Sequence, residues 1–192
     1  MTNIDPNQPN PAGPIQETEL HGRVPVGVPS TQPSPTQPQF YIRMAKPTYM
    51  RVLLGANIAM FVLMTVFGIL VYNDWQGTQN GRVLIFFGAK VNELIARGEV
   101  WRLFSAMFIH IGIIHLLFNL YALNVLGPMV EGFFGHRRFL LIYIIGGLWG
   151  SMASYAFSQA LSAGASGAIF GLAGATTVYF LRYRENFGSS LD

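Results

Sequence analysis

A serine between glycines, together with a histidine and an asparagine four residues apart, could do chemistry in this chain of 192 residues. The serine is Ser166, which stands in Gly164-Ala165-Ser166-Gly167 at the start of an apolar run to Leu181. A helix that begins near Ser166 places its unpaired backbone N–H groups and the positive end of its dipole at this hydroxyl. Such a position stabilises an alkoxide or an oxyanion. Ser166 is therefore a candidate nucleophile.

His110, His115 and Asn119 lie in an earlier apolar run, where polar groups are costly and mark candidate functional sites. On a helix, His115 and Asn119 share a face because they are four residues apart. His110 lies five residues before His115, about 140° around the same helix. A metal site would favour two histidines at i and i+4. We therefore expect no metal site, and we expect the side chains of Ser166, His110, His115 and Asn119 to meet in one polar pocket that opens to the outer face.

The His115–Asn119 pair and the segment around Ser166 can also be interpreted as purely structural. His115 and Asn119 could be hydrogen-bonding groups between membrane helices, and the small residues around Ser166 could simply let helices touch. A serine at a helix start is often a cap. The nucleophile is favoured because glycines flank Ser166 and because its span begins on the same side of the membrane as the histidines.

Four apolar runs must position these residues. Of all residues, 51% are hydrophobic and 11% are charged, and the mean hydropathy is +0.37. The runs, at about 52–72, 103–126, 139–157 and 165–181, are long enough to cross a hydrocarbon core of about 30 Å. We predict an all-α, polytopic transmembrane helix bundle over residues 45–192. It has no disulfides, because the chain has no cysteine.

The charges that flank the runs predict the topology. Residues 1–44 are rich in Pro and Gln and are expected to be a disordered tail, since they cannot bury enough apolar surface to offset chain entropy. Lys46 and Arg51 adjoin the first span, and Arg137 and Arg138 separate the second from the third, so the N-terminus is predicted to be cytoplasmic. We expect a multi-pass protein of a bacterial inner membrane. The net charge of +3 is small and its basic residues are scattered, which argues against nucleic acid as a partner.

Residues 73–102 are predicted to lie outside the membrane. Short apolar stretches at 84–88 and 91–95 predict short helices at the membrane interface, with Trp75 and Trp101 at headgroup depth. In the third and fourth spans, two stripes of small residues at four-residue spacing predict close helix contact. The stripes are Gly146, Gly150 and Ser154, and Gly167, Gly171 and Ala175.

Together these features resemble the rhomboid family of intramembrane serine proteases over roughly residues 47–184. The resemblance is carried by motifs at four places along the chain. They are Trp101-Arg102, His110-x4-His115-x2-Phe118-Asn119, Gly127-x3-Glu131 and Gly164-Ala165-Ser166-Gly167. The soluble-hydrolase pattern G-x-S-x-G fits less well, because Ala168 stands in place of its second glycine.

The resemblance implies roles for these residues. Ser166 would attack a peptide carbonyl, and His115 and Asn119 would hold the oxyanion together with the backbone N–H of Ser166. Six further residues would support the site. They are His110, Gly164, Gly167, Trp101, Arg102 and Glu131. The implied substrates are transmembrane-helix proteins in the lipid bilayer, and neither a cofactor nor a metal is implied.

In this family the general base is a histidine on a sixth membrane span. This sequence contains four predicted spans. A serine hydroxyl is a weak nucleophile without an adjacent base. We therefore expect the chain to represent part of a longer serine endopeptidase and to be inactive alone, with His110 the one substitute base. One alternative is a rhomboid-like pseudoprotease that binds transmembrane helices without cleavage. Another is a small channel or transporter subunit, which is disfavoured because the inner halves of the second and fourth spans are almost wholly apolar.

Overall fold

The computed structural model describes the backbone of residues 46–188 and the side chains of residues 46–184. The predicted tail at 1–44 lies outside the described residues, as does the segment 189–192. The residues described below belong to one compact unit.

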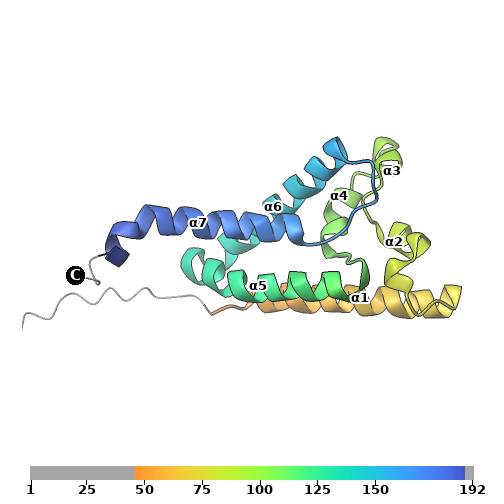
Figure 1. Cartoon of the computed structure of the whole chain (residues 1–192), viewed down its shortest axis with the longest axis horizontal. Helices are drawn as coiled ribbons and strands as arrows, with labels where there is room; N and C mark the ends of the chain where they lie inside the picture. The colour runs from red at the N-terminus through yellow and green to blue at the C-terminus, as the bar shows by residue number, and fades with distance from the viewer. Residues whose placement is uncertain (1–45, 189–192) are drawn as a thin grey trace, which may run out of the picture. The chain divides into compact units, whose positions relative to one another are not determined.

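Four long helices form most of this unit (Figure 1). They are α1 (Tyr49–Tyr72), α5 (Gly112–Phe134), α6 (His136–Phe157) and α7 (Ser166–Gly188). Short helices lie between α1 and α5. They are η2 (Gly77–Gln79), α2 (Gly81–Phe87), α3 (Asn92–Ala96), α4 (Arg102–Ser105) and η3 (Ala106–Phe108). Between residues 46 and 188 the only extended pairing is an isolated bridge of Lys90 with Ser162, so the all-α prediction is confirmed.

Three of the long helices, α1, α5 and α6, are long and apolar enough to cross a membrane, judged by length and composition. In the described part of the chain α7 is not among them, because glycines, threonines and two arginines lower its mean hydropathy. The four predicted spans are thus all present as helices, and three of them qualify as membrane spans. The two short helices predicted at 84–88 and 91–95 are present as α2 and α3.

The bounds predicted for the second span, 103–126, are wrong. The helix begins at Gly112 and continues to Phe134. Residues 102–108 instead form α4 and η3, which are not collinear with α5. Gly112 has φ +77°, a left-handed conformation that glycine adopts without strain, and this residue turns the chain into α5. Hydropathy alone could not show this break, because the residues on both sides of it are apolar.

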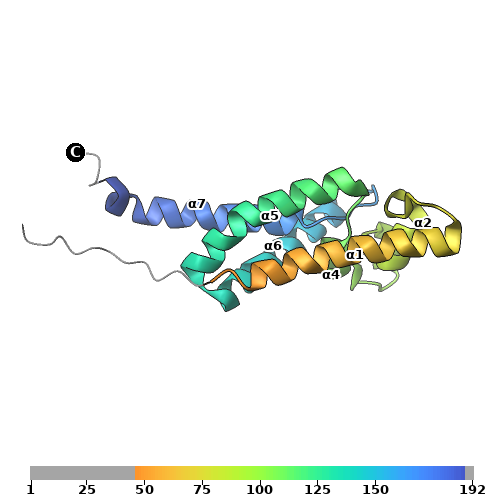
Figure 2. The same cartoon turned by 90° about the horizontal axis from the view of Figure 1, so that it is seen from below.

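Glu131 fastens the end of α5 to the start of α1. Its carboxylate is fully buried and accepts the backbone N–H groups of Thr48 (2.9 Å), Tyr49 (2.8 Å) and Met50 (2.8 Å). These N–H groups have no partner within their own helix, and the helix dipole favours a negative charge beside them. His136 Nδ1 contacts the same carboxylate at 2.5 Å. Figure 2 shows α1 and α5 meeting at this end and diverging towards the other.

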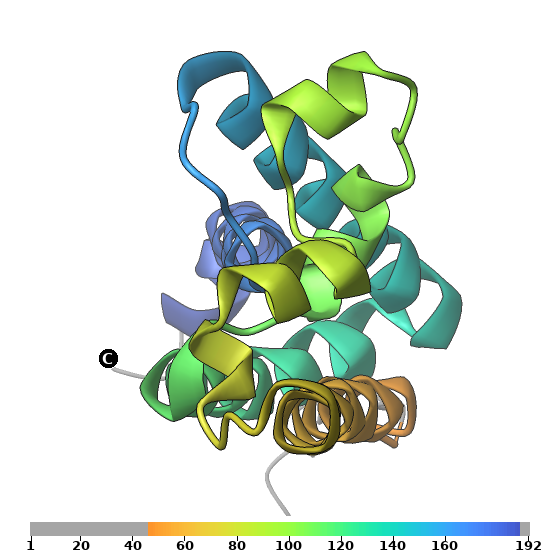
Figure 3. The ribbon, with the colours of Figure 1, turned by 90° about the vertical axis from the view of Figure 1, so that its right-hand side faces the viewer.

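Helices α6 and α7 touch backbone to backbone. A Cβ atom on Gly150 would lie 2.7 Å from the Cα of Gly167, and one on Gly146 would lie 3.1 Å from the Cα of Gly171. The predicted small-residue stripes are confirmed at these four positions. Viewed along the long helices, α7 lies between α5 and α6 (Figure 3).

Replacing Glu131 by alanine should lower the free energy of unfolding by about 3 kcal/mol, because three N–H groups at the start of α1 lose their acceptor. Equilibrium unfolding in detergent micelles measures this change. Glu93 is exposed, so Glu93→Ala is the control and should change stability by less than about 0.5 kcal/mol. Equal effects of the two substitutions would contradict the role given to Glu131.

The close contact between the glycines of α6 and α7 leads to a second prediction. Gly167→Val should force α6 and α7 apart and destabilise the fold by about 3 kcal/mol. Gly174 lies on the same helix with nothing within 4 Å of a Cβ, so Gly174→Ala should stabilise the protein by up to about 1 kcal/mol. The same unfolding experiment compares the two, and a stability loss in Gly174→Ala similar to that in Gly167→Val would show that backbone contact is not the cause.

Candidate active site

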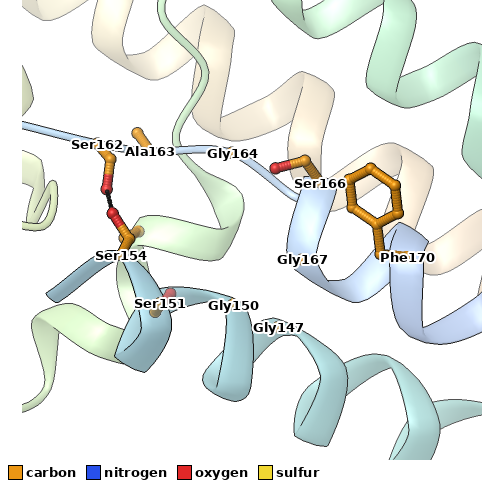
Figure 4. A pocket seen from close by; sticks show the side chains of 11 residues that line it. Gly147, Gly150, Ser151, Ser154, Ser162, Ala163, Gly164, Ser166, Gly167 and Phe170 are labelled. Carbon is orange, nitrogen blue, oxygen red and sulfur yellow. Dashed lines mark hydrogen bonds between the residues drawn. The ribbon is translucent and has the colours of Figure 1, made fainter. Parts of the chain in front are cut away.

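Ser166 is the first residue of α7 and is exposed. It borders two depressions. One, of about 280 Å³, lies between α6, α7 and the connection at 158–165, and on its other side the hydroxyls of Ser154 and Ser162 are 2.8 Å apart (Figure 4). The other, of about 250 Å³, lies between α5 and α7. Its lining includes His115, Phe118, Asn119, Ser166 and Phe170.

The His115 ring lies against Gly164, two residues before Ser166. A Cβ atom on Gly164 would come 2.6 Å from Cε1 and 2.7 Å from Nε2 of His115. Gly164 also has φ +129°, which side chains other than glycine's rarely allow. Only glycine at this position therefore lets the ring approach the segment that leads into α7.

A long hydrogen bond indicates which nitrogen of His115 carries the proton. The backbone N–H of Ile111 donates to His115 Nδ1 at 3.4 Å. A ring nitrogen that accepts a hydrogen bond is unprotonated, so in the neutral ring the proton lies on Nε2. Nε2–H is then a donor on the side of the ring that faces Gly164, beside the α5–α7 depression.

Asn119 lies one helical turn beyond His115 and is buried. Its Nδ2 donates one hydrogen bond to the backbone carbonyl of His115 at 2.8 Å. A carboxamide nitrogen carries two N–H groups, so one donor remains for a ligand. The structure thus brings three of the four residues predicted to share a pocket, Ser166, His115 and Asn119, together at one depression.

His110 does not lie on α5, so the predicted angle of 140° between it and His115 on a common helix is wrong. It precedes the turn at Gly112, and its ring centroid is 5.3 Å from that of His115 in an edge-on arrangement. It is fully buried, without a well-formed hydrogen bond to either ring nitrogen in the described part of the chain. It lines neither depression beside Ser166, so the prediction that His110 shares a pocket with Ser166 is wrong: its ring packs against that of His115 instead. Within the same described residues, no group of three His, Asp or Glu side chains could hold a metal ion.

Arg102 holds the segment between α2 and α4 together. Its buried guanidinium donates to the backbone carbonyls of Ile85 (2.7 Å) and Ala89 (3.2 Å), and it pairs with Glu99 at 2.7 Å. The guanidinium carbon also lies 4.7 Å from the centroid of the Trp101 ring. These two motif residues therefore line neither depression beside Ser166, and they brace the segment between α2 and α4.

Known proteins with similar sequences show the family to which this chain is related. Residues 97–191 match the family model described as the Rhomboid domain. Rhomboid protease GluP of Bacillus subtilis (strain 168) is 46% identical over 142 residues, which are 74% of this chain and 26% of that protein. The chain belongs to the rhomboid family. With three apolar helices of sufficient length, this rhomboid is a multi-pass integral membrane protein.

Eukaryotic rhomboids are also similar to this chain. RHOMBOID-like protein 2 of Arabidopsis thaliana is 54% identical over 81 residues, which are 42% of this chain and 26% of that protein. Rhomboid-like protease 2 of Toxoplasma gondii is 38% identical over 95 residues, which are 48% of this chain and 34% of that protein. The chain therefore spans between 26% and 34% of the length of these three relatives.

Two residues of this rhomboid that contact the connection before Ser166 were not singled out from the sequence. They are Lys90 and Asn92, which lie before the family match begins. Burial lowers the pKa of the Lys90 ammonium, and the nearby Glu93 carboxylate partly opposes this shift. The available signal was a lysine within the otherwise apolar stretch Gly88-Ala89-Lys90-Val91, and the same pattern also fits an exposed loop.

The Ile111–His115 hydrogen bond predicts the tautomer of His115. In a chain labelled with ¹⁵N-histidine and held at about pH 8, the His115 ring should give the Nε2–H pattern in NMR spectra, because Nδ1 is an acceptor. Loss of one resonance set in His115→Asn assigns the signal. An Nδ1–H pattern for His115 would contradict the donor geometry described above.

Proposed function

We propose that this rhomboid is a serine-type endopeptidase that cleaves transmembrane-helix proteins within the bilayer. The observation that carries the proposal is the shared depression of Ser166, His115 and Asn119 between α5 and α7. The similarity to Rhomboid protease GluP supports it, as does the family match that includes all three residues. Each side chain has a separate task in the reaction.

Ser166 is the proposed nucleophile. Its Oγ forms a bond to the carbonyl carbon of the scissile peptide, the carbonyl π electrons move to oxygen, and the hydroxyl proton passes to a base. The base later protonates the leaving amine, and water releases the acyl group. In the described part of the chain no side chain is hydrogen-bonded to the Ser166 hydroxyl. We therefore assign the base to a histidine outside these residues, as the family resemblance implies.

The oxyanion is proposed to lie between three donors. They are the Nε2–H of His115, the free N–H of Asn119 and the backbone N–H of Ser166 at the start of α7. Donors fixed before the reaction stabilise charge that develops only in the transition state, and removal of one typically costs about 3 kcal/mol. The burial of Asn119 and the Gly164–His115 contact fix two of these donors.

The site is proposed to open towards the side of the membrane opposite the chain's N-terminus. His115 is near the start of α5 and Glu131 near its end, and Glu131 contacts the start of α1. The basic residues Lys46 and Arg51 near the start of α1 support a cytoplasmic location for that end under the positive-inside rule. A bacterial inner membrane remains the expected location.

The test uses the natural full-length protein in proteoliposomes with a fluorophosphonate and a transmembrane reporter substrate. Wild-type protein should label at Ser166 and cleave the reporter, and Ser166→Ala should do neither. Asn119→Ala should lower kcat/KM about 10²-fold, because one oxyanion donor is lost. Thr177→Ala, an exposed change on α7, serves as the control.

A folded full-length protein that binds the reporter but neither labels nor cleaves would overturn the proposal. The pseudoprotease would then be the correct description.

A further inference from the structure

Lys90 is the one fully buried cation in the described part of the chain. The chain has two lysines, and the other, Lys46, is exposed. The ammonium of Lys90 donates to the backbone carbonyls of Ser158 at 2.6 Å and Ala160 at 3.1 Å. An amine buried without partners would be very costly, so these two carbonyls account for its position.

The carbonyls that Lys90 reaches lie just beyond α6. The last carbonyls of a helix have no partner within the helix, and the negative end of the dipole favours a cation beside them. Asn92 acts at the same place, where its Nδ2 donates to the carbonyls of Tyr155 (3.0 Å) and Ser158 (3.2 Å). Lys90 and Asn92 together therefore cap α6 from a segment more than 60 residues away in sequence.

The backbone of Lys90 is also hydrogen-bonded to the connection at 158–165. Its N–H donates to the Ser162 carbonyl at 2.9 Å, and the Ser162 N–H donates back to its carbonyl at 3.2 Å. Two residues further on, the Gly164 N–H donates to the Ala106 carbonyl at 2.8 Å. The connection is thus held by hydrogen bonds at its start, middle and end. Ser166 follows two residues after Gly164.

We propose that Lys90 is a positioning residue for catalysis: by fixing the 158–165 connection it sets the place of Ser166 relative to His115. The link is Gly164, which lies near the end of the connection and is in close contact with the His115 ring. A displacement of about 1 Å between a nucleophile and its oxyanion donors can cost about 100-fold in rate. This inference rests on the proposed protease function, and it assigns a role to a residue that lines neither depression beside Ser166.

A role in folding alone makes a different prediction. If Lys90 only stabilised the protein, a variant would contain fewer folded molecules, each with the wild-type turnover number. A positioning role instead lowers kcat per folded site and leaves KM nearly unchanged, because Lys90 lines neither depression in which a substrate would bind beside Ser166. Titration of the folded sites therefore separates the two roles.

The experiment compares Lys90→Met, Lys90→Arg and the control Lys46→Met in the natural full-length protein in proteoliposomes. Folded sites are counted by fluorophosphonate labelling driven to completion, and cleavage of a transmembrane reporter gives kcat and KM. Lys90→Met should lower kcat per labelled site about 10- to 100-fold with KM within about twofold. Lys90→Arg should recover part of this loss, because it keeps a charged donor. Lys46→Met should match wild type.

Hydrogen exchange on the same samples reports residues 158–165 directly. Lys90→Met should exchange faster there, with the start of α1 unchanged. If Lys90→Met does not fold, Asn92→Ala removes two of the cap's hydrogen bonds and should show the same changes in smaller measure. Wild-type kcat per site in the folded variant, or unchanged exchange at 158–165, would overturn the inference.

The two proposals can fail separately. A wild-type protein that neither labels nor cleaves refutes the protease function and with it any catalytic role of Lys90. An active wild-type protein with an equally active Lys90→Met refutes the positioning role alone.

Discussion

The contact between the backbones of α6 and α7 is the constraint on which the candidate site depends. Gly150 and Gly167 bring the two helices so close that no side chain fits between them. Because Ser166 directly precedes Gly167, this contact fixes the start of α7, where the hydroxyl and the free N–H groups of the first turn lie. In a membrane there is little hydrophobic drive to bring helices together, so close packing of small residues has to supply the association.

Polar groups complete the positioning at both ends of the long helices. At one end the Glu131 carboxylate accepts three N–H groups at the start of α1, and at the other Lys90 and Asn92 donate to carbonyls in the last turn of α6 and just beyond it. Both sets of hydrogen bonds have the same effect. Helix ends carry unpaired backbone groups, which cost free energy in an apolar environment unless they find partners. The partner in each case comes from a distant part of the sequence, so satisfying a helix end also joins two elements.

The site combines a rigid and an open part. The His115 ring is held between the Ile111 N–H and Gly164, and Asn119 is tied to the turn before it. Ser166 by contrast is exposed and borders two depressions, one towards α5 and one towards α6. Fixed donors beside an accessible hydroxyl are what acyl transfer requires, since the donors must be in place before charge develops.

The sequence by itself determined that four long helices form, that small residues bring two of them into contact, and which residues are candidates for the site. Hydropathy and four-residue spacing report these features, because they depend on one element or on one helix face. The tertiary structure decided where α5 begins, that His110 lies off that helix, and that Lys90 and Asn92 hold the connection before Ser166. The turn at Gly112 lies within a mainly apolar stretch with no change of hydropathy to mark it, and the partners of a buried lysine come from a remote helix end. No local pattern records either feature, because each is set by contacts between segments distant in the chain.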